Sequence, residues 1–134
     1  MPPAPADAAA LVQKVERLLA AVRARDRAAM LASFPEGEDV AIVFGAAELL
    51  RRADLATFFD RIASAPSRFD IALTLSASDV TDRLAFLAFL GTFREIAPGG
   101  DVVQERPYRL TAVFRRDGDR WTWIHCHASV RVDF

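Results

Sequence analysis

The period of the hydrophobic residues changes near Phe69, and this change constrains the fold of the chain more than any other feature. Before Phe69, apolar residues recur every three or four positions, which is typical of amphipathic helices. After it, they alternate every two positions, which is typical of half-buried strands. A chain with its helices first and its strands last is expected to form an α+β domain in which the helices pack on one face of an antiparallel sheet.

The first half of the chain contains three predicted helices and one clear strand. Asp7 is a suitable N-cap for the first helix, and Asp26 for the second. The predicted elements of this half are a helix over Asp7–Ala24, a helix over Asp26–Ser33, a strand over Asp39–Phe44, a short strand or turn over Glu48–Arg52, and a helix from Leu55 that ends before Pro66.

The second half is predicted to be a meander of long strands. Ala97–Asp101 and Asp117–Asp119 are rich in the Gly, Pro and Asp residues that form hairpin turns. The four predicted strands cover Phe69–Ser78, Arg83–Ile96, Val103–Arg116 and Arg120–Asp133.

Composition limits the class of protein. The chain has 134 residues, of which 52% are hydrophobic and 26% charged, so we expect a flexible N-terminus over 1–6 and a single domain over 7–134. The net charge is −1 and the arginines alternate with acids, which argues against a nucleic-acid partner. No segment resembles a leader peptide or a membrane span. Cys126 is the one cysteine, so a reducing, cytoplasmic location is expected.

The order of elements and one local motif carry a family resemblance. The order helix, helix, strand, helix and then long strands resembles the nuclear transport factor 2-like fold, which ketosteroid isomerase, the SnoaL-like cyclases and the association domain of calcium/calmodulin-dependent protein kinase II share. The segment FRRDGDRWTWIHCHAS, Phe114–Ser129, is similar to the closing hairpin of SnoaL-like and kinase-association domains. The resemblance implies a cone-shaped curved antiparallel sheet with about three helices on its concave face.

The same resemblance implies a pocket on the concave face and a homodimer through the opposite face. Alternation along the last strand places one set of side chains on one side: Trp121, Trp123, His125, His127 and Ser129. The opposite side, which includes Ile124, Cys126 and Ala128, is assigned to the pocket. The predicted pocket residues are Leu18, Phe44, Phe58, Phe89, Gly91, Phe93, Arg109, Thr111, Val113, Ile124, Cys126 and Ala128. The predicted dimer face contains Tyr108, Leu110, Phe114, Trp121, Trp123, His125 and His127.

The catalytic positions of the related families fall on unsuitable residues here. The proton-shuttling Asp of ketosteroid isomerase aligns with Phe44, its Tyr with Leu18, and its protonated Asp with Thr111 or Ala112. The three arginines of the kinase-association pocket align with Gly91, Thr111 and Ala128. An isomerase reaction by that route and an anionic ligand held in that way are therefore both disfavoured.

The two histidines and the cysteine are expected to have structural roles, not catalytic or metal-binding ones. His125 and His127 share one strand face at a spacing that can serve a metal, yet a zinc site would need Asp or Glu as its third protein ligand, so we predict no metal and no cofactor. A buried thiol with no cation beside it is ordinarily inert, which is the interpretation for Cys126.

Three functions remain open from the sequence. The first is a dimeric domain whose apolar pocket binds a hydrophobic small molecule. The second is an isomerase, dehydratase or cyclase-type enzyme that uses Asp39, Arg109 or Cys126 as its acid or base. The third is a dimerisation or assembly module.

Overall fold

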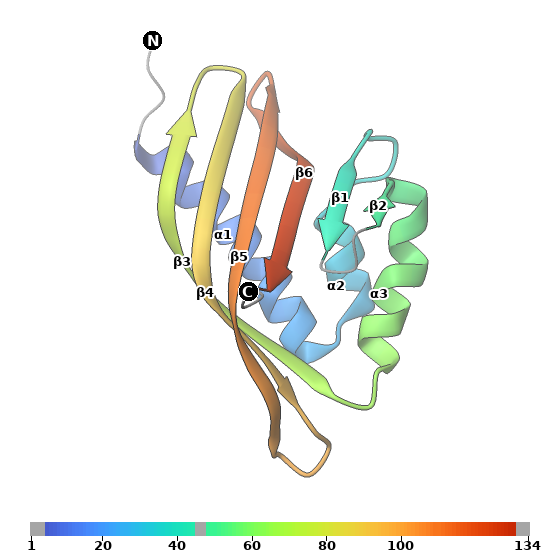
Figure 1. The fold of residues 1–134 in the computed structure, drawn as a ribbon. Coiled ribbons are helices and arrows are strands. Elements are labelled where there is room, and N and C mark those ends of the chain that lie inside the picture. Colours follow the sequence, from blue (N-terminus) through green and yellow to red (C-terminus); the bar gives the residue numbers. More distant parts are fainter. Residues whose placement is uncertain (1–4, 45–47, 131–134) are drawn as a thin grey trace.

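The computed structural model describes residues 5–44 and 48–130, which form helices followed by a curved sheet (Figure 1). The first predicted helix is confirmed, and it begins at Pro5 instead of Asp7. In chain order the elements are α1 (Pro5–Ala24), α2 (Arg27–Ala32), β1 (Ala41–Phe44), β2 (Leu49–Leu50), the 3-10 helix η1 (Arg52–Asp54), α3 (Leu55–Ser64), β3 (Arg68–Val80), β4 (Leu84–Ile96), β5 (Val102–Asp117) and β6 (Arg120–Val130). The last three residues of the predicted final strand, 131–133, lie outside the described residues.

The six strands form one sheet in the order β2-β1-β6-β5-β4-β3. The pairs from β3 to β6 are antiparallel, as predicted. The predicted curved antiparallel sheet is confirmed for these four strands, and β1 adds one parallel pair with β6. Along the chain, β2, η1, α3 and the strands β3 to β5 lie between β1 and β6, so no hairpin turn fixes the relative direction of this pair. The sheet is therefore mixed.

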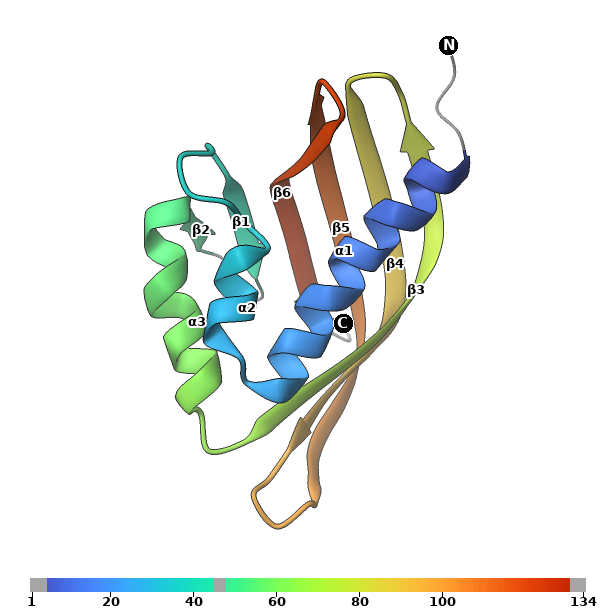
Figure 2. The same ribbon diagram turned by 180° about the vertical axis from the view of Figure 1, so that it is seen from behind.

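Helix α1 crosses one face of the sheet (Figure 2). Leu11, Val15 and Leu18 form its buried stripe, with exposures of 2% or less. Helix α1 ends at Ala24, and the next residue, Arg25, has a φ of 56° although it is not a glycine. The Arg25 guanidinium donates hydrogen bonds to the carbonyl oxygens of Ala65 and Pro66 at 3.0 and 3.3 Å. Those two bonds tie the end of α1 to the loop that enters β3, and they offset the cost of the left-handed backbone. None of the described helices combines the length and apolarity needed to cross a bilayer.

An aromatic cluster joins α2, α3 and the sheet. The Trp123 ring lies 4.7 Å from that of Phe34 and 5.3 Å from that of Phe114, measured between centroids. Phe34 also stacks on Phe59 of α3 at 6.3 Å. All four side chains are at most 2% exposed, so the cluster forms the centre of the core.

Strand β5 has the opposite orientation to the one predicted. Leu110 and Phe114 face the helices and are 2% and 0% exposed, whereas the dimer prediction required them to face outward. Arg109 and Thr111, which were predicted to lie inside, are exposed. The physical reason is the side-chain polarity of this strand, since its apolar residues alternate with an arginine and a threonine that are solvated on the outer face.

A β-bulge in β6 moves the two tryptophans to the inner face. Val113 pairs with His125 and Phe114 pairs with Trp123, so Ile124 is an extra residue on β6. The bulge shifts the alternation by one, and Trp123 therefore shares the helix-facing side with Cys126 instead of with His125 and His127. The indole N–H of Trp123 donates to the carbonyl oxygen of His125 at 2.8 Å, next to the bulge.

Candidate functional site

An apolar cavity of about 270 Å³ lies between the inner face of the sheet, α1 and α3. Every strand except β2 contributes a side chain to it, as do both helices. Tyr108 is the one lining residue in the described part of the chain that carries a polar side chain. The lining residues are Leu18, Leu19, Val22, Phe44, Phe58, Phe59, Ile62, Phe69, Ile71, Phe93, Tyr108, Leu110 and Val130.

Two groups of aromatic rings line this cavity. On one side Phe44 of β1 stacks on Phe58 of α3 with centroids 5.2 Å apart. On the other side Phe93 of β4 lies 5.5 Å from Phe69 of β3 and 5.6 Å from Tyr108 of β5. Ring faces and ring edges thus surround the space, which favours a flat or aliphatic apolar group inside it.

Burial keeps the two weak acids of the inner face neutral. Desolvation raises the pKa of the Tyr108 phenol well above its ordinary value, and the proximity of Cys126 raises it further. Desolvation alone raises the pKa of the Cys126 thiol, which is fully buried. At neutral pH the phenol can therefore donate or accept a hydrogen bond in the cavity, and the thiol behaves as a small apolar group.

The cavity brings together four of the twelve predicted pocket residues, which are Leu18, Phe44, Phe58 and Phe93. Phe89, Cys126 and Ala128 are buried in the core of the inner face without lining the cavity. Gly91 lies against β3, where an added Cβ would come within 1.9 Å of the Ala72 carbonyl oxygen. Arg109, Thr111 and Val113 lie on the outer face of β5, and Ile124 lies at the bulge.

Two of the seven predicted dimer-face residues lie on the outer face. Those two are His127, which is exposed, and His125, which is half-buried with its Nδ1 2.6 Å from the Ala41 carbonyl oxygen. In the described ranges no third His, Cys, Asp or Glu joins them to form a metal-binding group. The other five, Tyr108, Leu110, Phe114, Trp121 and Trp123, contact the cavity, the core or the groove beside α1.

The residues of the enzyme hypothesis are not brought together. Asp39 is exposed and pairs with Arg51 at 3.1 Å. Arg109 lies on the outer face and donates to the Ser129 hydroxyl at 3.2 Å. Cys126 lies on the inner face, so these three candidates occupy different surfaces of the molecule.

The sequence interpretation missed most of the residues that line the cavity. Leu19 and Val22 of α1, Ile62 of α3 and Ile71 of β3 have no chemistry that singles them out, and only the packing of these elements brings them together. The alternation in Tyr108–Phe114 was a usable signal, because Tyr108, Leu110, Ala112 and Phe114 are apolar at every second position. Burying that set, and not its neighbours, gives the observed strand orientation.

The fold and the cavity together define a class of protein: a helix-covered curved sheet of the nuclear transport factor 2-like type. The chain belongs to the SnoaL-like domain family, whose family model matches residues 12–133. No curated protein matches the sequence.

Solved structures share the fold at low sequence identity. A nuclear transport factor 2-like protein of unknown function from Pseudomonas putida is 22% identical, with a TM-score of 0.79 over 97% of this chain and 90% of that one. A candidate dehydratase of the same family from Streptomyces avermitilis is 18% identical, with a TM-score of 0.83 over 97% and 100%. A ketosteroid isomerase-like protein from Erwinia carotovora atroseptica is 16% identical, with a TM-score of 0.73 over 90% and 93%. These similarities show the fold.

Proposed function

We propose that this SnoaL-like domain binds a small, neutral, hydrophobic molecule in the cavity between α1, α3 and the sheet, and that it works as a homodimer. The observation that carries the proposal is the lining of the cavity, where twelve of thirteen side chains are aliphatic or phenylalanine and the thirteenth is Tyr108. A volume of about 270 Å³ is close to the lower end of ligand pockets, which run from roughly 300 to 1,000 Å³. A molecule of two or three rings would fill it.

Tyr108 gives this proposed ligand an orientation. A neutral phenol in an apolar space binds a carbonyl, hydroxyl or ether oxygen by a single hydrogen bond. A carboxylate or an ammonium group would lose its hydration without an opposite charge among the described lining residues, which costs several kcal/mol. The cavity therefore selects neutral molecules with one polar atom.

Binding without proton transfer is favoured over an isomerase reaction. Phe44 and Leu18, at the positions aligned with the isomerase base and tyrosine, both line the cavity and carry no ionisable group. A shuttle needs a group whose pKa lies near the working pH, and burial moves that of Tyr108 away from it.

The proposed dimer uses the outer face of β4 and β5. Leu84, Phe86 and Leu90 of β4 are 49%, 42% and 58% exposed, although they lie in the middle of the sheet. Their pairing partners across β5 include Val113 and Arg109. A second copy that covers the same face would bury this apolar strip around a two-fold axis.

The ligand proposal is tested with N-phenyl-1-naphthylamine, a neutral apolar probe whose emission rises when it leaves water. We expect saturable binding that Ile62→Trp, which fills the cavity, abolishes. Thr57→Trp adds the same bulk to an exposed position of α3 and should leave binding unchanged. Displacement by steroids, polyketides or fatty acids would then rank ligand classes. Emission that does not saturate, or that Ile62→Trp leaves intact, would contradict the proposal.

The dimer is tested by the mass of the particle in solution at micromolar concentration. We expect twice the chain mass, and the chain mass alone for Leu90→Asp. Leu49→Asp changes an equally exposed leucine on β2, 56% exposed, and should remain dimeric. A monomeric wild-type chain rejects this part of the proposal without affecting the cavity.

A further inference from the structure

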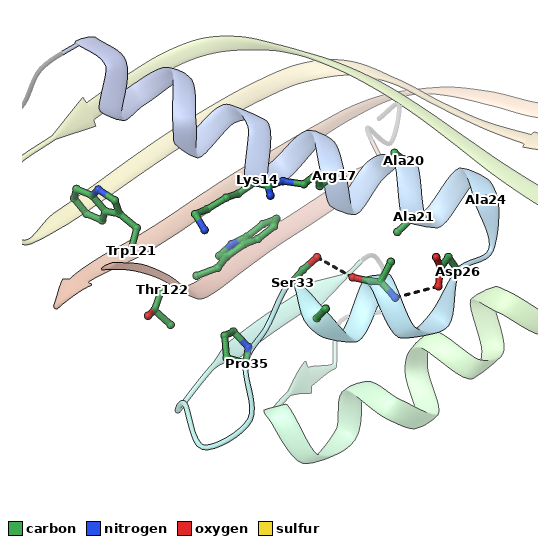
Figure 3. Close-up of a pocket in the computed structure, with 13 residues that line it drawn as sticks. Lys14, Arg17, Ala20, Ala21, Ala24, Asp26, Ser33, Pro35, Trp121 and Thr122 are labelled. Carbon is green, nitrogen blue, oxygen red and sulfur yellow. Dashed lines mark hydrogen bonds between the residues drawn. The ribbon is translucent and has the colours of Figure 1, made fainter. Parts of the chain in front are cut away.

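A second and larger cavity, of about 530 Å³, lies on the other side of α1 from the apolar one. It is a groove between α1, α2 and the first residues of β6 (Figure 3). The two cavities share no lining residue. Helix α1 thus presents a different stripe to each.

The stripe of α1 that faces the groove carries the cations. Lys14, Arg17, Ala21 and Ala24 are spaced by three or four residues, so they follow one line along the helix. Alanines make up much of the remaining lining, and their small side chains leave the groove open. Lys14 is half-buried, as is common for a lysine whose aliphatic stem packs on the protein while its ammonium group stays in water.

The charge in the groove is uneven. Lys14 and Arg17 lie toward the end where Trp121 is found, and Asp26 lies at the opposite end (Figure 3). Asp26 accepts a hydrogen bond from the Ala29 amide at 3.1 Å as the cap of α2. Over residues 5–44 and 48–130, no carboxylate pairs with Lys14 or Arg17 within 4.0 Å. The guanidinium of Arg116 lies 5.7 Å from the Trp121 ring centroid, but it pairs with Asp119 at 4.0 Å, so Lys14 and Arg17 are the cations that line this end of the groove.

Trp121 supplies an aromatic surface beside these cations. Trp121 and Trp123 both line the groove. Trp123 is only 2% exposed and its N–H is bonded to the His125 carbonyl, so Trp121 carries the accessible ring. Two cations next to an aromatic wall match a molecule that carries an anion at one end of a flat ring.

We propose that the groove between α1 and α2 is a second binding site, which takes a small organic anion with a flat apolar ring. The anionic group contacts Lys14 and Arg17, and the ring lies against Trp121. A volume of about 530 Å³ accommodates such a molecule. The site is independent of the proposed function of the apolar cavity, because the two select opposite ligands: an anion here, a neutral molecule there.

The test uses trans-cinnamate and its neutral isostere cinnamamide as probes. The chain has two tryptophans and both line this groove, so tryptophan emission excited at 295 nm reports on it. We expect cinnamate to change the emission saturably, with an affinity about tenfold above that of cinnamamide and falling with added salt. Calorimetry on the same samples gives the stoichiometry.

Matched variants locate the anion. Lys14→Ala combined with Arg17→Ala should lower the cinnamate affinity about tenfold and leave cinnamamide binding unchanged. Arg23→Gln removes a cation from the same helix, outside the groove and paired with Asp70, and should have no effect. Equal binding of the two probes, no binding of cinnamate up to millimolar concentration, or a loss in Arg23→Gln as large as in the double variant would overturn the proposal.

Discussion

The two faces of the sheet differ in how their apolar residues are covered. On the inner face, which α1 crosses, Phe114, Ala112 and Cys126 have no exposed surface. On the outer face Phe86 and Leu90 are about half exposed, although they lie on the same strand as the buried Leu87 and Phe89. The inner face is thus a buried core that contains a small cavity, whereas the outer face carries apolar side chains that are exposed to solvent in the single chain.

This difference separates the two functions proposed for the domain. A site for a small apolar ligand needs a space lined by apolar side chains, which α1, α3 and the sheet provide on the inner face. Association needs an accessible apolar strip, which β4 and β5 provide on the outer face. The same kind of substitution should therefore change the free energy of unfolding much more on the inner face than on the outer face.

The largest contrast is expected between Phe114 and Phe86. Phe114→Ala removes a ring that stacks on Trp123 in the core and should lower the unfolding free energy by about 3–5 kcal/mol. Phe86→Ala should lower it by less than about 1 kcal/mol. Denaturant titration of both variants in the Leu90→Asp background removes any contribution from association. Similar losses would mean that the two faces are equally buried.

Gly91 should show the next largest effect, because it allows β3 and β4 to approach closely. A Cβ at this position would come within 1.9 Å of the Ala72 carbonyl oxygen and 2.9 Å of the Leu73 Cα, so the strands would have to separate. We expect Gly91→Ala to cost about 3 kcal/mol. Gly99→Ala, with nothing within 4 Å, is the control and should be close to neutral. A neutral Gly91→Ala would show that this pairing is looser than described.

Neighbouring residues of β5 sharpen the comparison further. Ala112 has no exposed surface and Thr111 is exposed. Ala112→Val should overfill the core and cost about 1–3 kcal/mol, whereas Thr111→Val should change the unfolding free energy by less than about 0.5 kcal/mol. Thermal and denaturant unfolding of the two variants would check this. A larger loss of stability in Thr111→Val than in Ala112→Val would mean that β5 has the orientation predicted from the sequence.

The buried thiol should make the stability of the inner face depend on alkaline pH. Burial raises the pKa of Cys126 in the folded chain, whereas in the unfolded chain it titrates near about 8.5. Above that pH the unfolded state loses a proton that the folded state keeps, so stability falls by about 1.4 kcal/mol per pH unit. Unfolding measured from pH 8 to 9.5 should show stability falling ever more steeply, with the slope approaching this value at the upper end, and Cys126→Ala should lack this decline. Equal slopes in the two proteins would mean that the thiol is not buried.

The sequence was sufficient for the fold but not for the faces of its last two strands. Helix and strand periods predicted the elements, and the motif Phe114–Ser129 led to the correct family. The bulge at Ile124 was not predictable, because Trp121–Val130 reads as continuous alternation and a single extra residue leaves no mark in it. The apolar alternation of β5 was visible in the sequence, but its apolar residues Tyr108, Leu110 and Phe114 were assigned to an aromatic dimer face instead of to the core.

The cavity beside Tyr108 is tested most directly by a crystal structure of the chain under xenon pressure, since xenon enters dry apolar cavities without any knowledge of the natural ligand. Our account predicts a xenon atom in the space bounded by Leu18, Phe58, Phe93 and Tyr108. It also predicts that Ile62→Trp crystals hold none there. Side chains that fill this space in the wild-type crystal, or ordered water in place of xenon, would contradict it.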